Sequence, residues 1–242
     1  MIDGHAHLNE IKDIDAAISS ARSAGVGAII GVGMDIESNR ATIDIAGSFP
    51  GIVYPALGYH PWSIVADEIE QNLAFIKEKL PSCIALGEVG IDYKAKVKKK
   101  LQWDVYERLL SLAKEAGKPV IIHCRFSHAR TYEMTALAGI HWAVFHWFTG
   151  EKEVLARLLD SGYFISVTPA LAYSPFHREA AAFAPMDRIL AETDAPVEYQ
   201  GRISAPADVI LTLRELALIK GISIEEAGRI TERNTRSFYG LE

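Results

Sequence analysis

Eight short apolar segments recur along this chain, and stretches with helical periodicity separate them. The segments lie near Ile2, Ala28, Ile52, Ile84, Val120, Ala143, Tyr163 and Arg188, at a spacing of roughly 20 to 35 residues that is typical of a (β/α)8 barrel. Runs of this length, bounded by polar residues, Gly or Pro, indicate buried strands. The alternation therefore predicts an α/β fold of the TIM (β/α)8 type. A doubly wound open sheet is the competing architecture.

The C-terminal part of the sequence predicts the last barrel helix and one short extra helix. Val209, Leu213 and Leu216 place apolar side chains on one helical face. Ser223, followed by Glu226 three residues later, forms a capping-box pattern that opens a final helix. Because no Ser/Gly linker or change in composition divides the chain, we expect residues 1–242 to form a single domain.

Composition and charge limit the classes of protein to consider. With 242 residues, 49% hydrophobic and 23% charged, the chain can bury a sizeable core. Its first segment does not resemble a signal peptide, and no apolar run approaches the length of a membrane span. We therefore expect a cytoplasmic protein that makes no membrane contact. We also expect it to be a monomer. A net charge of −6 argues against a protein that coats nucleic acid through a general positive field.

Residue types that bind divalent metals stand at the ends of five of the predicted strands: His5, His7, Glu88, His123, His146 and Asp194. Parallel strands in a barrel would bring these side chains to one rim, where barrel enzymes carry their active sites. A His-x-His pair alone is a weak signal, but the same placement on five strands is a strong one. Four imidazoles and two carboxylates suit two divalent ions bridged by a carboxylate and a water, an arrangement that activates water for hydrolysis.

Several longer motifs surround these residues and occur in a specific order. They include Asp3-Gly-His5-Ala-His7, Leu86-Gly-Glu88-Val-Gly, Val120-Ile-Ile-His123-Cys-Arg125 and Glu192-Thr-Asp194-Ala-Pro196. As a set they resemble the TatD family of metal-dependent hydrolases and deoxyribonucleases, over nearly the whole chain. The resemblance implies a TIM barrel of the amidohydrolase type, dependence on divalent metals, and hydrolysis of DNA phosphodiesters from the 3′ end.

The same resemblance implies a role for each candidate ligand. His5 and His7 would bind the first ion, and His123 and His146 would bind the second. Glu88 would be the carboxylate that both ions share. Asp194 would bind the first ion and orient the bridging water, so that Asp194 and Glu88 are the catalytic residues. The ligand types leave the two ions open among Zn, Mg, Mn, Fe and Co.

Four further residues lie near these motifs, and three of them have two interpretations each. The resemblance places His60 beside the substrate phosphate, although a hydrogen-bonded structural histidine is an equal alternative. Arg125 could hold a phosphate through two guanidinium N–H groups or form a salt bridge to a carboxylate of a neighbouring loop. Asp92 could orient a ligand imidazole or cap a turn. Trp62 replaces a second histidine found in many family members, and its indole could bind a base by stacking.

A cluster of lysines follows the Glu88 motif: Lys94, Lys96, Lys98, Lys99 and Lys100. Such a run is commonly a solvated surface, but on the active rim it could also attract nucleic-acid phosphates. The favoured function is a metal-dependent phosphodiesterase that acts on DNA ends or oligonucleotides. A hydrolase of an amide, a lactone or a small phosphoester is the alternative enzyme, since paired metals polarise all these groups. A metal-holding interaction protein is the non-enzymatic alternative.

Overall fold

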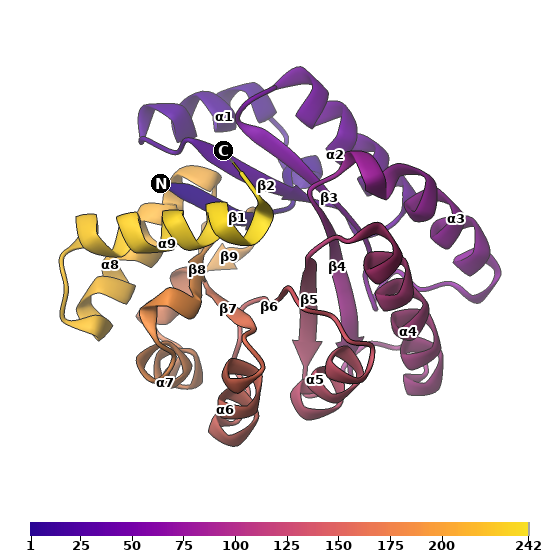
Figure 1. Ribbon diagram of the computed structural model, residues 1–242. Helices are drawn as coiled ribbons and strands as arrows, with labels where there is room; N and C mark the ends of the chain where they lie inside the picture. The colour runs from indigo at the N-terminus through magenta and orange to yellow at the C-terminus, as the bar shows by residue number, and fades with distance from the viewer. Residues whose placement is uncertain (242) are drawn as a thin grey trace.

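The computed structural model describes residues 1–241 and shows eight parallel strands in a ring, with helices packed outside them (Figure 1). Each strand pairs in parallel with the next along the chain, in the order β1 to β8. The strands are β1 (Ile2–Ala6), β2 (Ala28–Val32), β3 (Val53–Tyr59), β4 (Ala85–Asp92), β5 (Val120–Arg125), β6 (Ala143–Phe145), β7 (Phe164–Val167) and β8 (Ile189–Ala191). The (β/α)8 prediction is confirmed, and the open-sheet alternative is wrong.

The two ends of the sheet meet between β1 and the segment that follows β8. Ala6 forms a parallel bridge with Ala195, and the His7 N–H donates to the Ala195 carbonyl at 2.7 Å. The buried Asp3 carboxylate accepts hydrogen bonds from the Thr193 N–H at 2.8 Å and from its hydroxyl at 2.6 Å. This closure joins the first and last metal-binding motifs of the sequence.

The helices lie outside the strands and follow them in sequence. They are α1 (Ile14–Ser23), α2 (Ile36–Ser48), α3 (Ile69–Lys79), α4 (Lys99–Ala116), α5 (His128–Leu137), α6 (Lys152–Asp160), α7 (Pro175–Phe183), α8 (Val209–Lys220) and α9 (Ile224–Tyr239). The predicted cap of α9 is present, since the Ser223 side chain accepts from the Glu226 N–H and Gly240 ends the helix in a left-handed conformation. Among residues 1–241, no helix is both long and apolar enough to cross a bilayer.

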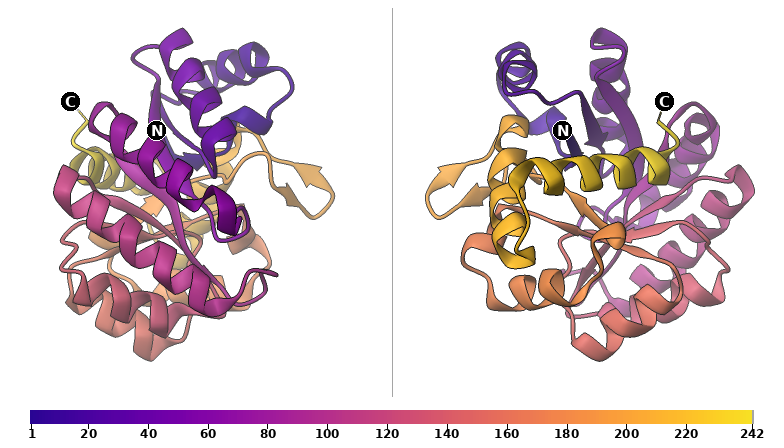
Figure 2. Two further views of the ribbon diagram at one scale, coloured as in Figure 1. Left: turned by 90° about the vertical axis from the view of Figure 1, so that its right-hand side faces the viewer. Right: turned by 60° about the vertical axis from the view of Figure 1, so that its left-hand side comes forward.

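Helix α9 lies across the N-terminal end of the barrel (Figure 2). Its Phe238 packs against Phe164 at the start of β7, with ring centroids 5.3 Å apart. Its Asn234 amide donates to the carbonyls of Met186 and Ile189 at 2.7 and 2.9 Å, at the start of β8. The extra helix therefore covers the end of the barrel opposite the predicted site.

A two-stranded hairpin, which the sequence did not predict, projects from the body of the protein after β8 (Figure 2). It consists of β9 (Glu198–Tyr199) and β10 (Arg202–Ile203), paired antiparallel. The two residues between them, Gln200 and Gly201, both have positive φ, at 51° and 86°. Positive φ at both central positions matches the twist of a tight hairpin. The strands are too short for a periodicity signal.

Candidate metal centre

The six predicted ligands converge at the C-terminal end of the barrel. His5, Glu88 and His123 lie within β1, β4 and β5, and the other three lie in the segments just after β1, β6 and β8. The prediction that Glu88 ends its strand is wrong, because β4 continues to Asp92. The pairing of β4 with both neighbouring strands is irregular between Leu86 and Val89. This irregularity lets a mid-strand carboxylate reach the ligand histidines.

The backbone beside Glu88 leaves no space for a side chain on the neighbouring strand. A Cβ atom on Gly58 of β3 would collide with the backbone nitrogen and oxygen of Glu88. Asn39 of α2 holds Gly58 in place through two hydrogen bonds, accepting from its N–H at 3.0 Å and donating to its carbonyl at 2.8 Å. Glycine is therefore required here so that β3 can approach the segment that carries Glu88.

The first set of donor atoms consists of His5 Nε2, His7 Nε2, Glu88 Oε2 and Asp194 Oδ1. His5 Nε2 lies 3.3 Å from His7 Nε2, 3.4 Å from Glu88 Oε2 and 3.5 Å from Asp194 Oδ1. His7 Nε2 lies 3.4 Å from each of the same two carboxylate oxygens. Tetrahedral ligand atoms about 2.1 Å from one ion are about 3.4 Å apart. The set therefore fits a divalent metal ion.

The surroundings of the Asp194 carboxylate also favour a metal ion at this set of donors. Within the part of the chain that the structure describes, its Oδ1 is buried and has no hydrogen-bond partner. A buried carboxylate oxygen without a partner is costly, and a cation beside it would remove that cost. The residue also adopts a left-handed backbone with φ of 53°, held by its N–H bond to the His5 carbonyl at 3.0 Å.

The second set of donor atoms surrounds the other oxygen of Glu88. Oε1 lies 2.7 Å from His123 Nδ1 and 3.5 Å from His60 Nε2. His60 Nδ1 accepts the Trp62 backbone N–H at 3.1 Å. With Nδ1 as an acceptor, a neutral His60 carries its proton on Nε2. His60 is therefore better suited to donate a hydrogen bond to Glu88 or to a substrate than to bind an ion.

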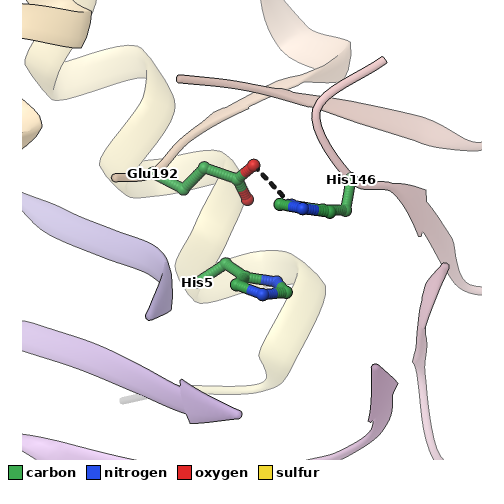
Figure 3. A group of neighbouring side chains, drawn as sticks. All are labelled: His5, His146 and Glu192. Atoms are coloured by element: carbon green, nitrogen blue, oxygen red, sulfur yellow. Dashed lines mark ion pairs between the residues drawn. The ribbon is translucent and has the colours of Figure 1, made fainter. Parts of the chain in front are cut away.

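His146 stands between the two sets. Its ring stacks on His5, with centroids 4.0 Å apart and planes at 16° (Figure 3). Its Nε2 lies 3.9 Å from Glu88 Oε1 and 3.7 Å from Asp194 Oδ2. Its Nδ1 faces the buried Glu192 carboxylate at 2.6 Å (Figure 3). A carboxylate behind a histidine fixes the ring and directs the opposite nitrogen toward a metal.

Asp92 occupies the matching position behind His123. Its Oδ2 lies 3.2 Å from His123 Nε2 and accepts the Trp62 indole N–H at 2.6 Å. Its Oδ1 accepts the Lys94 N–H at 2.6 Å. Trp62 is 56% exposed, so its ring is open for stacking while its N–H is already engaged. The link between Trp62 and Asp92 was not foreseen from the sequence.

Many of these residues line a pocket of about 510 Å³ that opens at the rim, although His5, Asp92 and Glu192 do not. Arg125 is exposed at its edge, where a guanidinium can reach a bound anion. The other lining residues are His7, Glu10, Met34, His60, Trp62, Glu88, His123, Cys124, His146, Trp147, Thr149, Ala170, Tyr173, Ser174, Asp194 and Val197.

Comparison with known proteins identifies the family. The model of the family described as "TatD related DNase" matches residues 2–240. The chain belongs to the TatD family of metal-dependent hydrolases. A Bacillus subtilis relative, the uncharacterized metal-dependent hydrolase YabD, is 30% identical over 257 residues, covering 100% of this chain and 99% of the relative. The human deoxyribonuclease TATDN3 is 27% identical and covers 99% of this chain and 94% of its own.

A solved TatD structure shows the same barrel. The crystal structure of YJJV, a TatD homologue from Escherichia coli, superposes with a TM-score of 0.93 at 25% identity, covering 100% of this chain and 98% of that one. The match extends over the whole described chain, so it includes both ends of the barrel.

The electrostatics of this TatD-family site favour charged carboxylates. Burial opposes the charge on Glu88, but the histidines around it outweigh burial and hold its pKa well below the usual range. Burial likewise opposes the charge on Asp194, yet His146 and His7 lower its pKa. Burial disfavours a charged His146, but Glu192, Asp194 and Glu88 raise its pKa to about 10. Burial and the nearby His123 lower the pKa of His60 to about 4.

Glu192 is the residue of the site to which sequence reasoning gave no role. The signal was present, because Glu192 stands two positions before Asp194 in the same motif. Residues two apart in an extended segment can face the same side. The two carboxylates approach opposite nitrogens of His146, Glu192 at Nδ1 and Asp194 at Nε2.

Proposed function

We propose that this TatD-family hydrolase uses two divalent ions to cleave phosphodiester bonds at DNA ends, removing nucleotides from the 3′ end. The observation that carries the proposal is the position of Glu88. One carboxylate presents Oε2 to His5 and His7, and Oε1 to His123. A carboxylate placed between two sets of donors suits a two-metal site for phosphoryl transfer. The name of the human relative, a deoxyribonuclease, also supports a DNA substrate.

The proposed ligands divide between the two ions. His5, His7 and Asp194 would bind the first ion, His123 and His146 the second, and Glu88 both. When bound, the ions would acidify a water molecule and offset charge on the phosphate. Asp194 would accept the proton of the attacking water, because its lowered pKa keeps it ionised.

The residues around the pocket mouth would hold the substrate phosphate. Arg125 is exposed at the rim and can grip two phosphate oxygens at once. His60 would donate from Nε2, since its Nδ1 accepts the Trp62 backbone N–H.

The proposals that the protein acts as a monomer and works in the cytoplasm remain predictions.

The test compares substrates on protein reconstituted with Zn²⁺, Mn²⁺ or Mg²⁺. We expect wild-type protein to shorten a single-stranded oligonucleotide from its 3′ end and to leave a panel of amides and lactones unchanged. Asp194→Asn should lower turnover by about 100-fold or more with metal still bound, because a positioned base contributes that much. Arg125→Ala should chiefly raise KM for phosphodiesters.

Metal content is measured for each variant, and the exposed Arg214→Ala on α8 serves as the arginine control. If reconstituted wild-type protein leaves the oligonucleotide intact and hydrolyses a lactone or an amide, the nuclease proposal is wrong and the alternative hydrolase takes its place.

A further inference from the structure

An exposed aromatic residue stands at the rim directly after the proposed phosphate-binding Arg125. Phe126 follows the last residue of β5 and is 64% exposed. Its φ is 56°, in the left-handed region that bulky side chains rarely adopt. A large apolar ring held toward solvent by an unfavourable backbone points to a binding role, because folding alone would favour neither feature.

Cations surround this ring and the neighbouring Tyr93. Lys94 Nζ lies 5.1 Å from the Phe126 ring centroid, and the Arg125 guanidinium carbon lies 6.0 Å from it. Lys99 Nζ lies 4.2 Å from the centroid of Tyr93. These contacts place three positive charges beside two aromatic rings on one stretch of the rim.

Most of the lysine cluster has no anionic partner among residues 1–241. Lys100 pairs with Asp104 at 3.0 Å. In the described chain, no carboxylate lies within 4.0 Å of the amino groups of Lys94, Lys96, Lys98 or Lys99, all of which are exposed. Five lysines within seven residues repel one another, in a protein whose net charge is −6. An external anion would relieve that repulsion.

The aromatic and cationic residues connect directly to the metal centre. The Tyr93 N–H donates to the Arg125 carbonyl at 3.0 Å. This hydrogen bond joins the segment after β4 to the end of β5. The Lys94 N–H donates to Asp92, whose carboxylate also faces His123. Arg125 lines the metal-site pocket. The aromatic and cationic surface therefore adjoins the metal-site pocket at Arg125.

We propose that this surface, the Phe126 strip, binds single-stranded nucleic acid next to the end that lies in the pocket. The strip consists of Tyr93, Lys94, Lys96, Lys98, Lys99, Arg125 and Phe126. A base stacks on Phe126, and the lysines bind the adjoining phosphates. The interior base pairs of a duplex have both faces covered, so the strip favours single strands over duplex. The inference rests on the proposed nuclease function, since it names how that substrate is held.

The primary test measures binding of a fluorescein-labelled phosphorothioate oligothymidylate, which resists cleavage, to the metal-loaded protein by fluorescence anisotropy. Phe126→Ala should weaken binding about 10-fold or more, as loss of a stacking platform does. Phe126→Trp should retain the affinity of wild type. Replacing Lys96, Lys98 and Lys99 together with Gln should flatten the dependence of binding on salt concentration, because fewer counterions are released.

Phe183→Ala is the matched control. Phe183 is also an exposed ring with a lysine beside it, Lys152 at 4.9 Å, but neither of its neighbours in sequence lines the metal-site pocket, whereas Phe126 follows Arg125, which does. Its replacement should leave binding unchanged. Unchanged affinity in Phe126→Ala, or an equal loss in Phe183→Ala, would overturn the proposal.

Vesicles of phosphatidylserine and phosphatidylcholine provide the other probe, since aromatic and basic residues together also suit an anionic membrane. Wild-type binding to the vesicles that depends on Phe126, with oligothymidylate binding independent of it, would assign the strip to a membrane instead. Because anisotropy measures binding without cleavage, a protein that binds through Phe126 but cuts no oligonucleotide would refute the proposed function and keep the strip.

Discussion

Asp92 connects three different partners at the rim of the barrel. One oxygen faces His123 Nε2 and accepts the Trp62 indole N–H, and the other accepts the Lys94 N–H. These hydrogen bonds outweigh the burial that opposes its charge, so they hold the pKa of Asp92 below its usual range. A charged Asp92 fixes the His123 ring with Nδ1 toward Glu88. The single carboxylate therefore links the metal centre to the exposed Trp62.

We predict that Asp92→Asn weakens binding of the ion held by His123 about 10- to 100-fold, as loss of a histidine's outer partner does. Affinity for the ion held by His5 and His7 should change little. Trp62→Phe, which removes the N–H and keeps a ring, should produce a smaller loss in the same direction. Calorimetric titration of the metal-free protein measures both affinities, with the exposed Asp15→Asn on α1 as control. Equal weakening of both ions would contradict this role.

One buried histidine of helix α7 bonds to two segments near the site. His177 Nδ1 donates to the Phe148 carbonyl at 2.8 Å, and its Nε2 accepts the Thr168 N–H at 3.1 Å. One nitrogen donates and the other accepts, so the ring must be neutral. Burial lowers the pKa of His177 to about 4 from 6.5. The helix thus depends on an uncharged side chain to hold the segments after β6 and β7.

The lowered pKa of His177 makes stability depend on pH. Between the unfolded value of 6.5 and the folded value of about 4, the unfolded chain binds a proton that the folded chain does not. Stability is therefore lost as the pH falls through this range. At about pH 5 the loss from this residue is about 2 kcal/mol relative to neutral pH.

We predict that His177→Gln, although less stable at neutral pH, loses less stability than wild type when the pH falls to about 5. Urea unfolding at both pH values measures the difference, and the exposed His141→Gln is the control. If the wild type and His177→Gln lose equal stability, the buried neutral histidine does not carry the effect.

The elements that sequence could predict are those with periodic patterns. The eight strands and α9 follow from apolar spacing and from the cap at Ser223, which the structure contains. The β9–β10 hairpin has only two residues in each strand and no alternation to detect. The continuation of β4 past Glu88 depends on its irregular pairing with β3 and β5, which is a tertiary property.

The ligand residues of the candidate site could be predicted from the sequence, but several of the contacts between site residues could not. His5 and His7 share a strand face by simple alternation, and closure of the barrel brings Asp194 to them. The Trp62–Asp92 hydrogen bond joins residues that are 30 apart in sequence. The local sequence around either residue does not predict it. The sequence shows a carboxylate at Glu192, but its role could be assigned only once the structure placed it beside His146.

At the scale of the whole molecule, the closing helix and the candidate site lie at opposite ends of the barrel. Helix α9 closes the N-terminal end through Phe238 and Asn234, whereas the metal-site pocket, the Phe126 strip and the exposed Trp62 occupy the C-terminal end. Five exposed lysines between residues 94 and 100 give this end a local positive charge, although the net charge of the chain is −6.

The central claim is that two ions sharing Glu88 cut DNA ends together, and a metal titration tests it most directly. Zn²⁺ or Mn²⁺ is added stepwise to metal-free protein, and bound metal and release of nucleotides from a 3′-labelled oligonucleotide are measured at each step. We predict little cleavage at one ion per chain and full cleavage at about two, with Glu88→Ala binding both ions weakly and cutting nothing. Full activity with one ion bound, or two ions bound tightly by Glu88→Ala, would contradict the account.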